Sequence, residues 1–509
     1  MADHQQTIDG LVRAQAAAYG PKPMVIDPDR RLSYGELDST TKELAGWLVE
    51  SGIGKGSRVA LIMHNGVRWV QIAVAAMRIG AVLVPLSTLL KPAELVAQLQ
   101  VASVQFVIGV TEFRGRRFLE DIESAGREQL PALQGFWSTD ELGVAASEAS
   151  EIVDAMTETV TAADPLVIVF TSGSSGTPKG VLHTHGSALG AVRAGLAPRC
   201  ITSDSRLYLP MPFFWVGGLA SGILSALAAG ATLVTEELPR PETTLRLVES
   251  ERVTLFRGWP DQAEALARHP DRPLVDLSAL RPGSLEALLP PALRARPGAR
   301  AVLFGMTEAF GPYCGFPADT DMPETAWGSC GKPFPGMEVR IVDVDTGEPV
   351  PAGTVGMIQL RGPHTLRGIC RRSREEVFTV DGYYPTGDLA HFDDDGFLFY
   401  HGRTDDMFKV SGASVYPGEV ERTLRGIDGV DGAFVTNVAG AQGEQVGAVV
   451  VTSREDLTAE RLRGQARELL SSFKVPTVWL VLDSDDDLPR GSTGKVDVLR
   501  LREMLITTT

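Results

Sequence analysis

The sequence has few cysteines, no long apolar run and a shortage of positive charge. Cys200, Cys314, Cys330 and Cys370 are scattered over 509 residues without a Cys-x-x-Cys pair, so neither a zinc site nor a disulfide framework is indicated. No stretch of 18 apolar residues occurs, and the beginning MADHQQTIDG has no basic segment followed by an apolar one. We therefore expect a reduced, cytoplasmic protein without a signal peptide or a membrane span.

Acidic side chains outnumber basic ones. Asp and Glu total 64 against 48 Lys and Arg, which gives a formal net charge of −16. Nucleic acids and anionic membranes repel such a protein, so neither is an expected partner, and any anionic ligand must be met by a local basic site. The chain is also too long for one compact core, so two or more domains are expected.

A stretch rich in glycine and hydroxyl groups, FTSGSSGTPKG at 170–180, directly follows an apolar run. Glycine lets a backbone approach a ligand closely, and hydroxyls, amides and the ammonium group of Lys179 suit phosphate oxygens. The spacing differs from the common nucleotide loop G-x-x-x-x-G-K-[ST], because Gly173 and Gly176 are too close together and Gly180 follows the lysine. On composition alone, a flexible Gly/Ser surface loop explains the stretch equally well.

Apolar runs typical of strands alternate with Ala/Leu-rich segments of helical period, which predicts parallel or mixed sheets covered by helices. After about Thr325 the pattern changes to short strands and turns, and a further α+β pattern follows Arg403. We expect an α/β fold with a large N-terminal domain at 1–403, including a β-rich subdomain at about 325–403, and a small α+β domain at 404–509. The expected strands are 58–63, 105–110, 165–170, 231–234, 253–256, 301–304, 337–342, 356–361 and 446–452, and the expected helices are 34–51, 67–79, 419–425 and 458–471.

Four further motifs follow in order along the chain. They are FGMTE at 304–308, YYPTGDLA at 383–390, GRTDDMFKVSGASVYPGEVE at 402–421 and PRGSTGK at 489–495. Each has an ordinary explanation by itself, such as a turn, a strand end, a loop or a hairpin tip. Together with the loop at 170–180 they resemble the signature motifs of the acyl-adenylate-forming superfamily, which includes acyl-CoA synthetases, peptide-synthetase adenylation domains and beetle luciferases.

The resemblance implies which residues bind ATP. Glu308 stands at the family's metal-ligand position and would bind Mg²⁺ as a hard oxygen donor, and Thr307 would offer its hydroxyl to the α-phosphate. The alternative for Glu308 is a buried acid that closes a salt bridge. Phe304 would lie against adenine, Asp388 would accept both ribose hydroxyls, and Arg403 would contact the ribose and phosphate region. The residues implied in binding the β- and γ-phosphates are Thr171, Ser172, Gly173, Ser174, Ser175, Gly176, Thr177 and Lys179.

The resemblance also implies a reaction in two steps with a domain rotation between them. Lys495 would reach between the carboxylate and the α-phosphate during adenylation. Asp405 corresponds to the hinge about which the small domain rotates afterwards. Gly412 would let the pantetheine arm of coenzyme A pass close to the backbone, so that its thiol attacks the acyl-adenylate and expels AMP. The implied activity is an AMP-forming acyl-CoA ligase that uses ATP (or acyl-AMP), Mg²⁺ and coenzyme A.

Three departures from the family pattern stand out. Trp215 occupies a position that is histidine in many relatives, and Met357 replaces a usual glutamate. Leu285 and Glu286 stand where the family has glycines beside adenine and the acyl group, so they bring bulk and a carboxylate into that region. Aromatic and small side chains around Trp215 favour an apolar acid over a polar amino acid as the substrate. The predicted acyl-pocket residues are Phe213, Phe214, Trp215, Gly217, Gly218, Leu285 and Glu286.

Three other functions stay open at this point. A Glu286 carboxylate near the phosphates would repel Mg-ATP more than an acyl-adenylate, which would leave a ligase that depends on an adenylate made by a separate partner. A second alternative passes the acyl group to the thiol of a separate carrier protein. The third is a non-catalytic sensor of acyl nucleotides. The sequence identifies neither the carboxylic acid, nor the acceptor thiol, nor the oligomeric state.

Overall fold

The computed structural model describes residues 6–143, 149–171, 178–404, 408–410, 413–415, 417–440, 443–470, 474–490 and 496–507. The chain forms two compact units, the first of Met1–Glu338 and Leu360–Tyr384 and the second of Val339–Gln359 and Pro385–Thr509. The domain boundary expected after Arg403 stays a prediction. Among the helices in the described ranges, none combines the length and the apolarity that a membrane crossing needs.

The largest sheet of the first unit contains seven strands in the order β17-β8-β7-β4-β3-β5-β6. The strands from β7 to β6 pair in parallel, whereas β7 and β8 form an antiparallel pair. Strands β4 and β5 are buried throughout, as expected for parallel strands that are covered on both faces. The strands are β3 (Arg58–Ile62), β4 (Val82–Pro85), β5 (Phe106–Gly109), β6 (Gly135–Ser138), β7 (Pro165–Thr171), β8 (Lys179–Thr184) and β17 (Gly368–Ile369).

Two smaller sheets complete the strands of the first unit. In the five-stranded sheet, of order β11-β9-β10-β1-β2, the strands from β11 to β1 are parallel, so their carboxyl ends meet at one edge. The other sheet is an antiparallel hairpin, β12–β13, to which β14 adds. The strands are β1 (Pro23–Ile26), β2 (Arg31–Ser33), β9 (Arg206–Tyr208), β10 (Thr232–Val234), β11 (Leu255–Phe256), β12 (Phe304–Met306), β13 (Gly311–Gly315) and β14 (Lys332–Pro333).

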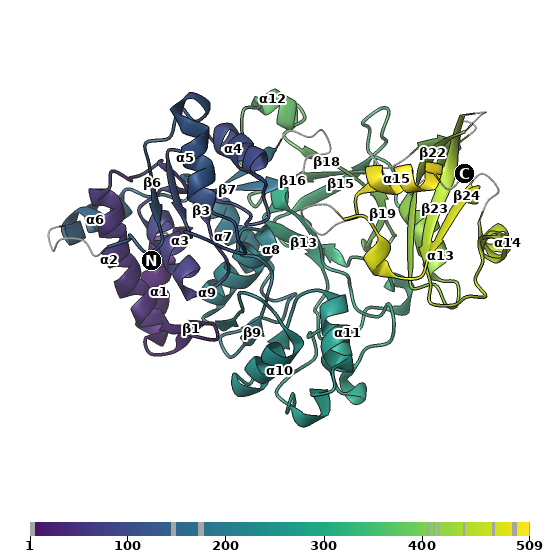
Figure 1. Ribbon diagram of the computed structural model, residues 1–509, viewed down its shortest axis with the longest axis horizontal. Coiled ribbons are helices and arrows are strands. Elements are labelled where there is room, and N and C mark those ends of the chain that lie inside the picture. The colour runs from purple at the N-terminus through teal and green to yellow at the C-terminus, as the bar shows by residue number, and fades with distance from the viewer. Residues whose placement is uncertain are drawn as a thin grey trace. The chain divides into compact units, whose positions relative to one another are not determined.

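Helices cover these sheets, and α1, α2 and α6 lie side by side (Figure 1). Helix α2 begins with a capping box in which Ser33 and Glu36 each bind the other's backbone N–H, which satisfies two donors that a helix start leaves open. The helices of this unit are α1 (Ile8–Tyr19), α2 (Tyr34–Glu50), α3 (Val67–Arg78), α4 (Pro92–Val101), α5 (Phe118–Gln129), α6 (Ala149–Glu158), α7 (His185–Ala194), α8 (Val216–Gly218), α9 (Ser225–Ala229), α10 (Pro241–Ser250), α11 (Pro260–Arg268) and α12 (Arg374–Val377), together with the π-helix η2 (Leu219–Leu224).

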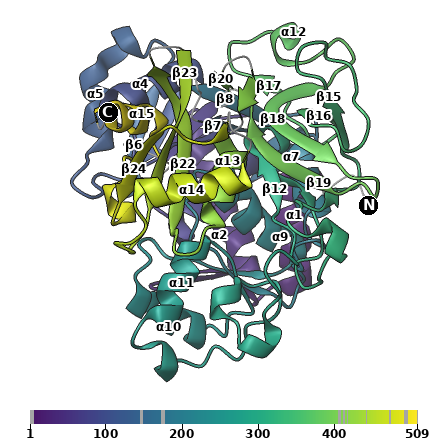
Figure 2. The ribbon, with the colours of Figure 1, turned by 90° about the vertical axis from the view of Figure 1, so that its right-hand side faces the viewer.

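The second unit contains a sheet of order β22-β23-β24 with helices on both faces. Ala448 and Val450 of β23 pack with α13 and α14, whereas Val449 and Val451 pack with α15, which is the two-residue alternation of a strand buried on both sides (Figure 2). The elements of this unit are β20 (Phe408–Val410), β21 (Ala413–Val415), α13 (Pro417–Arg425), β22 (Gly432–Gly440), β23 (Gly443–Val451), α14 (Ala459–Leu469), β24 (Val478–Leu482) and α15 (Val498–Thr507). A four-stranded sheet at the division of the units contains β15 (Glu338–Val342), β16 (Gly356–Arg361), β18 (Tyr384–Phe392) and β19 (Leu398–Arg403).

The predicted α/β class is confirmed, and most predicted elements are present within one or two residues of their expected bounds. The strand predicted at 301–304 is wrong, because only Phe304 belongs to a strand and Val302 has 66% of its surface exposed. An apolar run in the sequence does not show whether its side chains are covered in the fold. Here the first strand of the hairpin β12–β13 begins only at Phe304, and Val302 lies before it in solvent.

A buried arginine joins the first three helices. Arg78 on α3 is 1% exposed, and its Nε donates to Asp9 Oδ1 of α1 at 2.9 Å. Its two terminal nitrogens reach Asp38 Oδ1 at 2.9 Å and Thr41 Oγ1 at 2.8 Å, both on α2. The guanidinium therefore balances the buried Asp9 carboxylate and fixes the three helices against one another.

We expect Arg78→Met to lower the free energy of unfolding by about 3–5 kcal/mol, because the substitution leaves the buried Asp9 carboxylate with only the half-exposed Arg13 as a cation partner. Urea unfolding measures the effect. The matched control is Arg117→Gln, since Arg117 is 57% exposed and its pair with Glu120 should contribute less than about 1 kcal/mol. Similar losses for the two variants would contradict the role of Arg78.

Candidate active site

The hairpin β12–β13 positions Thr307 and Glu308. Its turn is a short 3₁₀ segment, Thr307–Ala309, and Phe310 follows in the left-handed region at φ +54°. Gly305 has to be glycine, because a Cβ there would lie 2.3 Å from the carbonyl oxygen of Gly311. The backbone N–H of Leu366 donates to the Glu308 carbonyl at 2.8 Å. The sequence FGMTEAFG therefore forms a tight turn that holds the Glu308 side chain inward, at 5% residue exposure.

Lys179 reaches the same place from β8. The end of β7 and the start of β8 are paired at Thr171 and Lys179, so these two residues flank the predicted phosphate loop. The Lys179 ammonium group forms an ion pair with Glu308 Oε1 and donates to the Tyr384 hydroxyl at 2.6 Å. The Tyr384 hydroxyl donates to the same Glu308 oxygen at 3.0 Å. The structure thus brings together two predicted catalytic residues, Lys179 and Glu308, with a tyrosine to which the sequence analysis gave no role.

The surroundings of Glu308 agree with the alternative of a buried acid that closes a salt bridge, and they also suit the metal-ligand prediction. Its Oε1 binds Lys179 and Tyr384, whereas no described residue donates to its Oε2. Mg²⁺ is commonly held by one or two carboxylates together with phosphate and water oxygens, so this single oxygen fits. The described residues contain no group of three or more His, Cys, Asp or Glu side chains that would hold a metal alone.

A buried histidine contacts the backbone of this turn. His183 on β8 is fully buried, and its Nε2 lies 2.7 Å from the Thr307 carbonyl oxygen. A carbonyl only accepts, so Nε2 carries the proton. Burial lowers the pKa of His183 to about 4, against the ordinary 6.5, although the Thr307 carbonyl and the Glu308 charge both raise it. The imidazole is therefore neutral at physiological pH and acts as a support for Thr307.

The segment predicted to form the acyl pocket leaves the carboxyl end of β9. Asn65 fixes it, because its Oδ1 accepts from the Phe213 N–H at 2.8 Å and its Nδ2 donates to the Met211 carbonyl at 3.0 Å. Phe213 is fully buried against Trp69 of α3. Trp215 is partly exposed, and its ring meets that of Phe214 edge-on at 5.4 Å. Gly217 and Gly218 lie in α8, and a Cβ at Gly218 would lie 2.2 Å from the Pro212 carbonyl oxygen.

The Glu286 carboxylate has a local partner. Its Oε2 accepts from the Ala295 N–H at 2.9 Å, and the Leu285 N–H donates to the Phe256 carbonyl at 3.0 Å. Leu285 packs against the apolar cluster that contains Phe256. Glu286 thus has a local structural role.

Asp388 and Arg403 meet in the second unit. They are paired residues of β18 and β19, and Arg403 Nη1 lies 3.3 Å from Asp388 Oδ1. The N–H of Asp388 donates to Thr386 Oγ1 at 2.9 Å, which holds the strand at TGD. Phe304, in the first unit, is partly exposed, and its ring meets that of Tyr313 edge-on at 5.6 Å. The described ranges do not include Ser172, Gly173, Ser174, Ser175, Gly176, Thr177, Asp405, Gly412 or Lys495.

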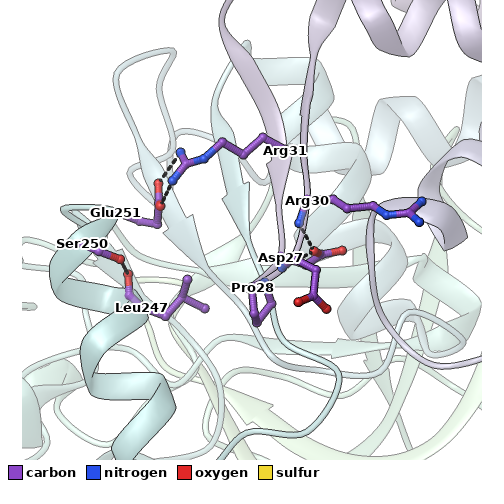
Figure 3. Close-up of a pocket in the computed structure, with 8 residues that line it drawn as sticks. Asp27, Pro28, Arg30, Arg31, Leu247, Ser250 and Glu251 are labelled. Carbon is purple, nitrogen blue, oxygen red and sulfur yellow. Dashed lines mark hydrogen bonds and ion pairs between the residues drawn. The ribbon is translucent and has the colours of Figure 1, made fainter.

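Two surface cavities contain none of the predicted site residues. The larger has a volume of about 420 Å³, and Figure 3 shows Arg31 paired with Glu251 and Asp27 bound to a backbone N–H in its wall. Arg31 Nη1 lies 3.0 Å from Glu251 Oε2, and Asp27 Oδ1 accepts the N–H of Arg30 at 2.7 Å. The other cavity, of about 350 Å³, is lined by Glu338, Arg361, Gly362, Thr365, Leu366, Arg367, Arg374, Phe378, Asp381 and Gly382.

The AMP-binding enzyme family matches residues 12–370 of this chain. The chain belongs to the AMP-binding enzyme family. This membership confirms the resemblance to the acyl-adenylate-forming superfamily, and it agrees with a site built from Lys179, Thr307 and Glu308, all of which lie inside the matched range.

Relatives that match along nearly the whole chain indicate the class of enzyme. The chain is 32% identical to 3-[(3aS,4S,7aS)-7a-methyl-1,5-dioxo-octahydro-1H-inden-4-yl]propanoyl:CoA ligase of Mycobacterium tuberculosis, over 94% of this chain and 95% of the relative. It is 30% identical to feruloyl-CoA synthase of Amycolatopsis sp., over 91% and 92%. The structure of ATP-bound MatB from Rhodopseudomonas palustris matches with a TM-score of 0.80 over 98% of this chain and 99% of MatB, at 24% identity, which supports the fold.

These relatives are coenzyme A ligases and synthetases. The predicted enzyme class, an AMP-forming acid–thiol ligase, is therefore confirmed for this AMP-binding enzyme, and the carrier-protein, adenylate-dependent and sensor alternatives are not favoured.

Tyr384→Phe removes the hydroxyl that links Lys179 to Glu308. A hydrogen bond to a charged group contributes about 1.5–3 kcal/mol, so we expect ATP–pyrophosphate exchange to slow about ten- to hundredfold. The matched control is Tyr383→Phe, since the Tyr383 hydroxyl lies 3.1 Å from the exposed Glu338 carboxylate and should matter little. Equal exchange rates for the two variants would argue against a site centred on Tyr384.

The low pKa of His183 predicts acid sensitivity. An unfolded histidine takes up its proton near pH 6.5 and the folded His183 only near pH 4, so the unfolded state binds more protons between these values and stability falls as the pH is lowered from about 6.5 to 4. The full shift corresponds to about 3 kcal/mol. Thermal unfolding across this pH range should show a shallower loss in His183→Gln than in the native protein, and parallel curves would refute the assignment.

Proposed function

We propose that the protein joins a carboxylic acid with an apolar body to coenzyme A through an acyl-adenylate, with Lys179, Thr307 and Glu308 in the ATP site. The observation that carries the proposal is the Lys179–Glu308–Tyr384 cluster of a member of the AMP-binding enzyme family, in which Lys179 directly follows the predicted phosphate loop in the sequence. The aromatic segment around Trp215 supports the apolar body of the acid.

Adenylation joins two anions, so the site has to balance negative charge before the carboxylate attacks the α-phosphate. Lys179 is held by Glu308 and Tyr384 at the end of the loop, and a held ammonium group loses little freedom when phosphate arrives. Mg²⁺, when bound at Glu308 Oε2, would supply further positive charge. Thr307 would donate to the α-phosphate, with its backbone fixed by His183.

The second step attacks the carbonyl carbon of the adenylate. The thiol sulfur of coenzyme A forms the new bond, the bond from that carbon to the phosphate oxygen breaks, and AMP leaves with the electron pair. Asp388 and Arg403 would hold the ribose of the nucleotide through both steps, and rotation about Asp405 would bring Gly412 to the thiol path.

A direct comparison of acceptors tests the function. With ATP, Mg²⁺ and a panel of apolar acids, we expect thioester formation with coenzyme A to exceed that with a phosphopantetheinylated carrier protein. No AMP formation with any acid would contradict the ligase proposal, and faster transfer to the carrier would reassign the acceptor.

We expect Lys495→Ala to abolish adenylation, measured as ATP–pyrophosphate exchange, and to spare thioester formation from a synthetic acyl-adenylate. The reason is that the lysine charge is needed only where the carboxylate meets the α-phosphate. Lys474→Ala is the control, because Lys474 pairs with Glu419 at 2.6 Å and should leave exchange unchanged. Equal loss of both half-reactions in Lys495→Ala would refute its role.

A further inference from the structure

Three arginine side chains gather in the first unit without a carboxylate partner. They are Arg199, Arg257 and Arg281, and none forms an ion pair within the ranges that the structure describes. Backbone carbonyl and hydroxyl oxygens accept their hydrogen bonds in place of carboxylates. Arg199 Nη2 donates to Ser225 Oγ at 2.8 Å, and Arg281 Nη2 donates to Ser205 Oγ at 2.6 Å. Three like charges close together thus lack the counter-ion that such groups normally have when buried.

Arg257 is the least satisfied of the three. Its Nη2 donates to the Arg199 carbonyl at 2.8 Å, but its buried Nε has no partner among the described residues. Arg257 as a whole residue is partly exposed. Burial, together with the charge of Arg281, lowers the pKa of Arg257 to about 10, although Cys200 raises it. Buried donors without acceptors are costly, which favours an occupant that supplies oxygen atoms.

The nearby carboxylate of Asp319 has other partners. Thr320 Oγ1 donates to Asp319 Oδ1 at 3.0 Å, and the carboxylate also interacts with Cys200 and Arg300. Arg300 in turn pairs with Asp321 at 2.9 Å. The charge of the Arg257 cluster is therefore not balanced by this acidic segment.

Arg257 lies at an edge where ligands commonly bind. It directly follows β11, and β11 pairs in parallel with β9, so both strands end at the same edge of the sheet. The Arg257 N–H donates to the Tyr208 carbonyl at 2.9 Å, and β9 continues from Tyr208 into the segment that carries Trp215. In open parallel sheets, ligands bind outside the carboxyl ends of the strands.

Two further contacts link the cluster to segments of the proposed acyl site or next to it. A Cβ at Gly283 would lie 3.4 Å from Arg257 Nη2, and Gly283 precedes Leu285 and Glu286. Arg199 Nη1 donates to the Ser221 carbonyl at 3.4 Å, inside the π-helix η2 that follows Trp215. π-Helical turns are frequent at functional sites. The two segments predicted around the acyl group, the one that carries Trp215 and the one that carries Leu285 and Glu286, thus border the arginine cluster.

We propose that Arg257 binds a second carboxylate of the acyl substrate, at the end remote from the carboxyl group that is adenylated. This inference rests on the proposed function and names its substrate class: an acid with an apolar body and an anionic tip. A guanidinium group can bind a carboxylate with two parallel hydrogen bonds, and the Arg257 Nε has no acceptor among the described residues. The apolar walls around Trp215 contact the body, and the arginine cluster neutralises the tip.

Matched acids test the proposal. The pair 3-(4-carboxyphenyl)propanoate and 3-(4-methylphenyl)propanoate differs only in the tip, as does octanedioate against octanoate. We expect kcat/KM for ATP–pyrophosphate exchange to favour the diacid at least about tenfold in the native protein, and Arg257→Gln to lower the diacid value about a hundredfold while changing the monoacid value little. Arg257→Lys, which keeps the charge without the fork, should lie between them. Arg268→Gln, at a 77% exposed arginine, is the control.

Two results would overturn the proposal: a native preference for the monoacids, or an Arg257→Gln variant with an unchanged ratio between the acids. A separate readout distinguishes its failure from failure of the ligase function. If no acid supports exchange, thermal unfolding with the diacid alone still reports on Arg257. A rise in the unfolding temperature of the native protein that Arg257→Gln lacks supports the binding role, and the same shift, or none, in both proteins refutes it.

Discussion

The charge balance between Glu308 and Lys179 is the constraint on which the site depends. A carboxylate side chain with 7% exposure needs a cation, because the cost of removing it from water is several kcal/mol. Lys179 supplies that cation from the first position of β8, and the Tyr384 hydroxyl bridges the two groups. The hairpin β12–β13 and the pair β7–β8 therefore have to meet for either side chain to be stable. Phosphate oxygens and a metal ion would each bind one member of this pair, so ligand binding and the ion pair are linked.

The proposed acyl site combines an apolar segment with a group of arginines. The aromatic segment after β9 is anchored in the core by Asn65 and Trp69, whereas the charged groups at its far side, Arg199 and Arg257, have no acidic partner in the described ranges. One side of the proposed acyl site is thus apolar, and the other is cationic and contains the Arg257 Nε, which has no partner among the described residues. Such an arrangement discriminates between acids by their tips, because a neutral tip leaves buried donors unpaired.

Sequence alone predicted the parts of the structure that local pattern determines. The continuous apolar runs of β3, β5 and β7 are typical of strands covered on both faces, and they appear where expected. The strand at 301–304 failed because a run of apolar residues does not report exposure, and Val302 is exposed. The motifs placed Lys179 and Glu308 in one site, but Tyr384 escaped notice, since its role depends on a contact with a residue 76 positions earlier. Arg257 gave no signal in the sequence, because its meaning comes from the absence of an acid around it.

The central claim is that the acid's own carboxylate attacks ATP, and an isotope experiment tests it most directly. A single turnover with ATP, Mg²⁺, coenzyme A and an acid labelled with ¹⁸O in its carboxyl group should yield AMP that contains one ¹⁸O atom, with the thioester keeping the other. The bridging oxygen of the adenylate comes from the acid and leaves with the phosphate. AMP without the label, or ADP as the nucleotide product, would contradict the account.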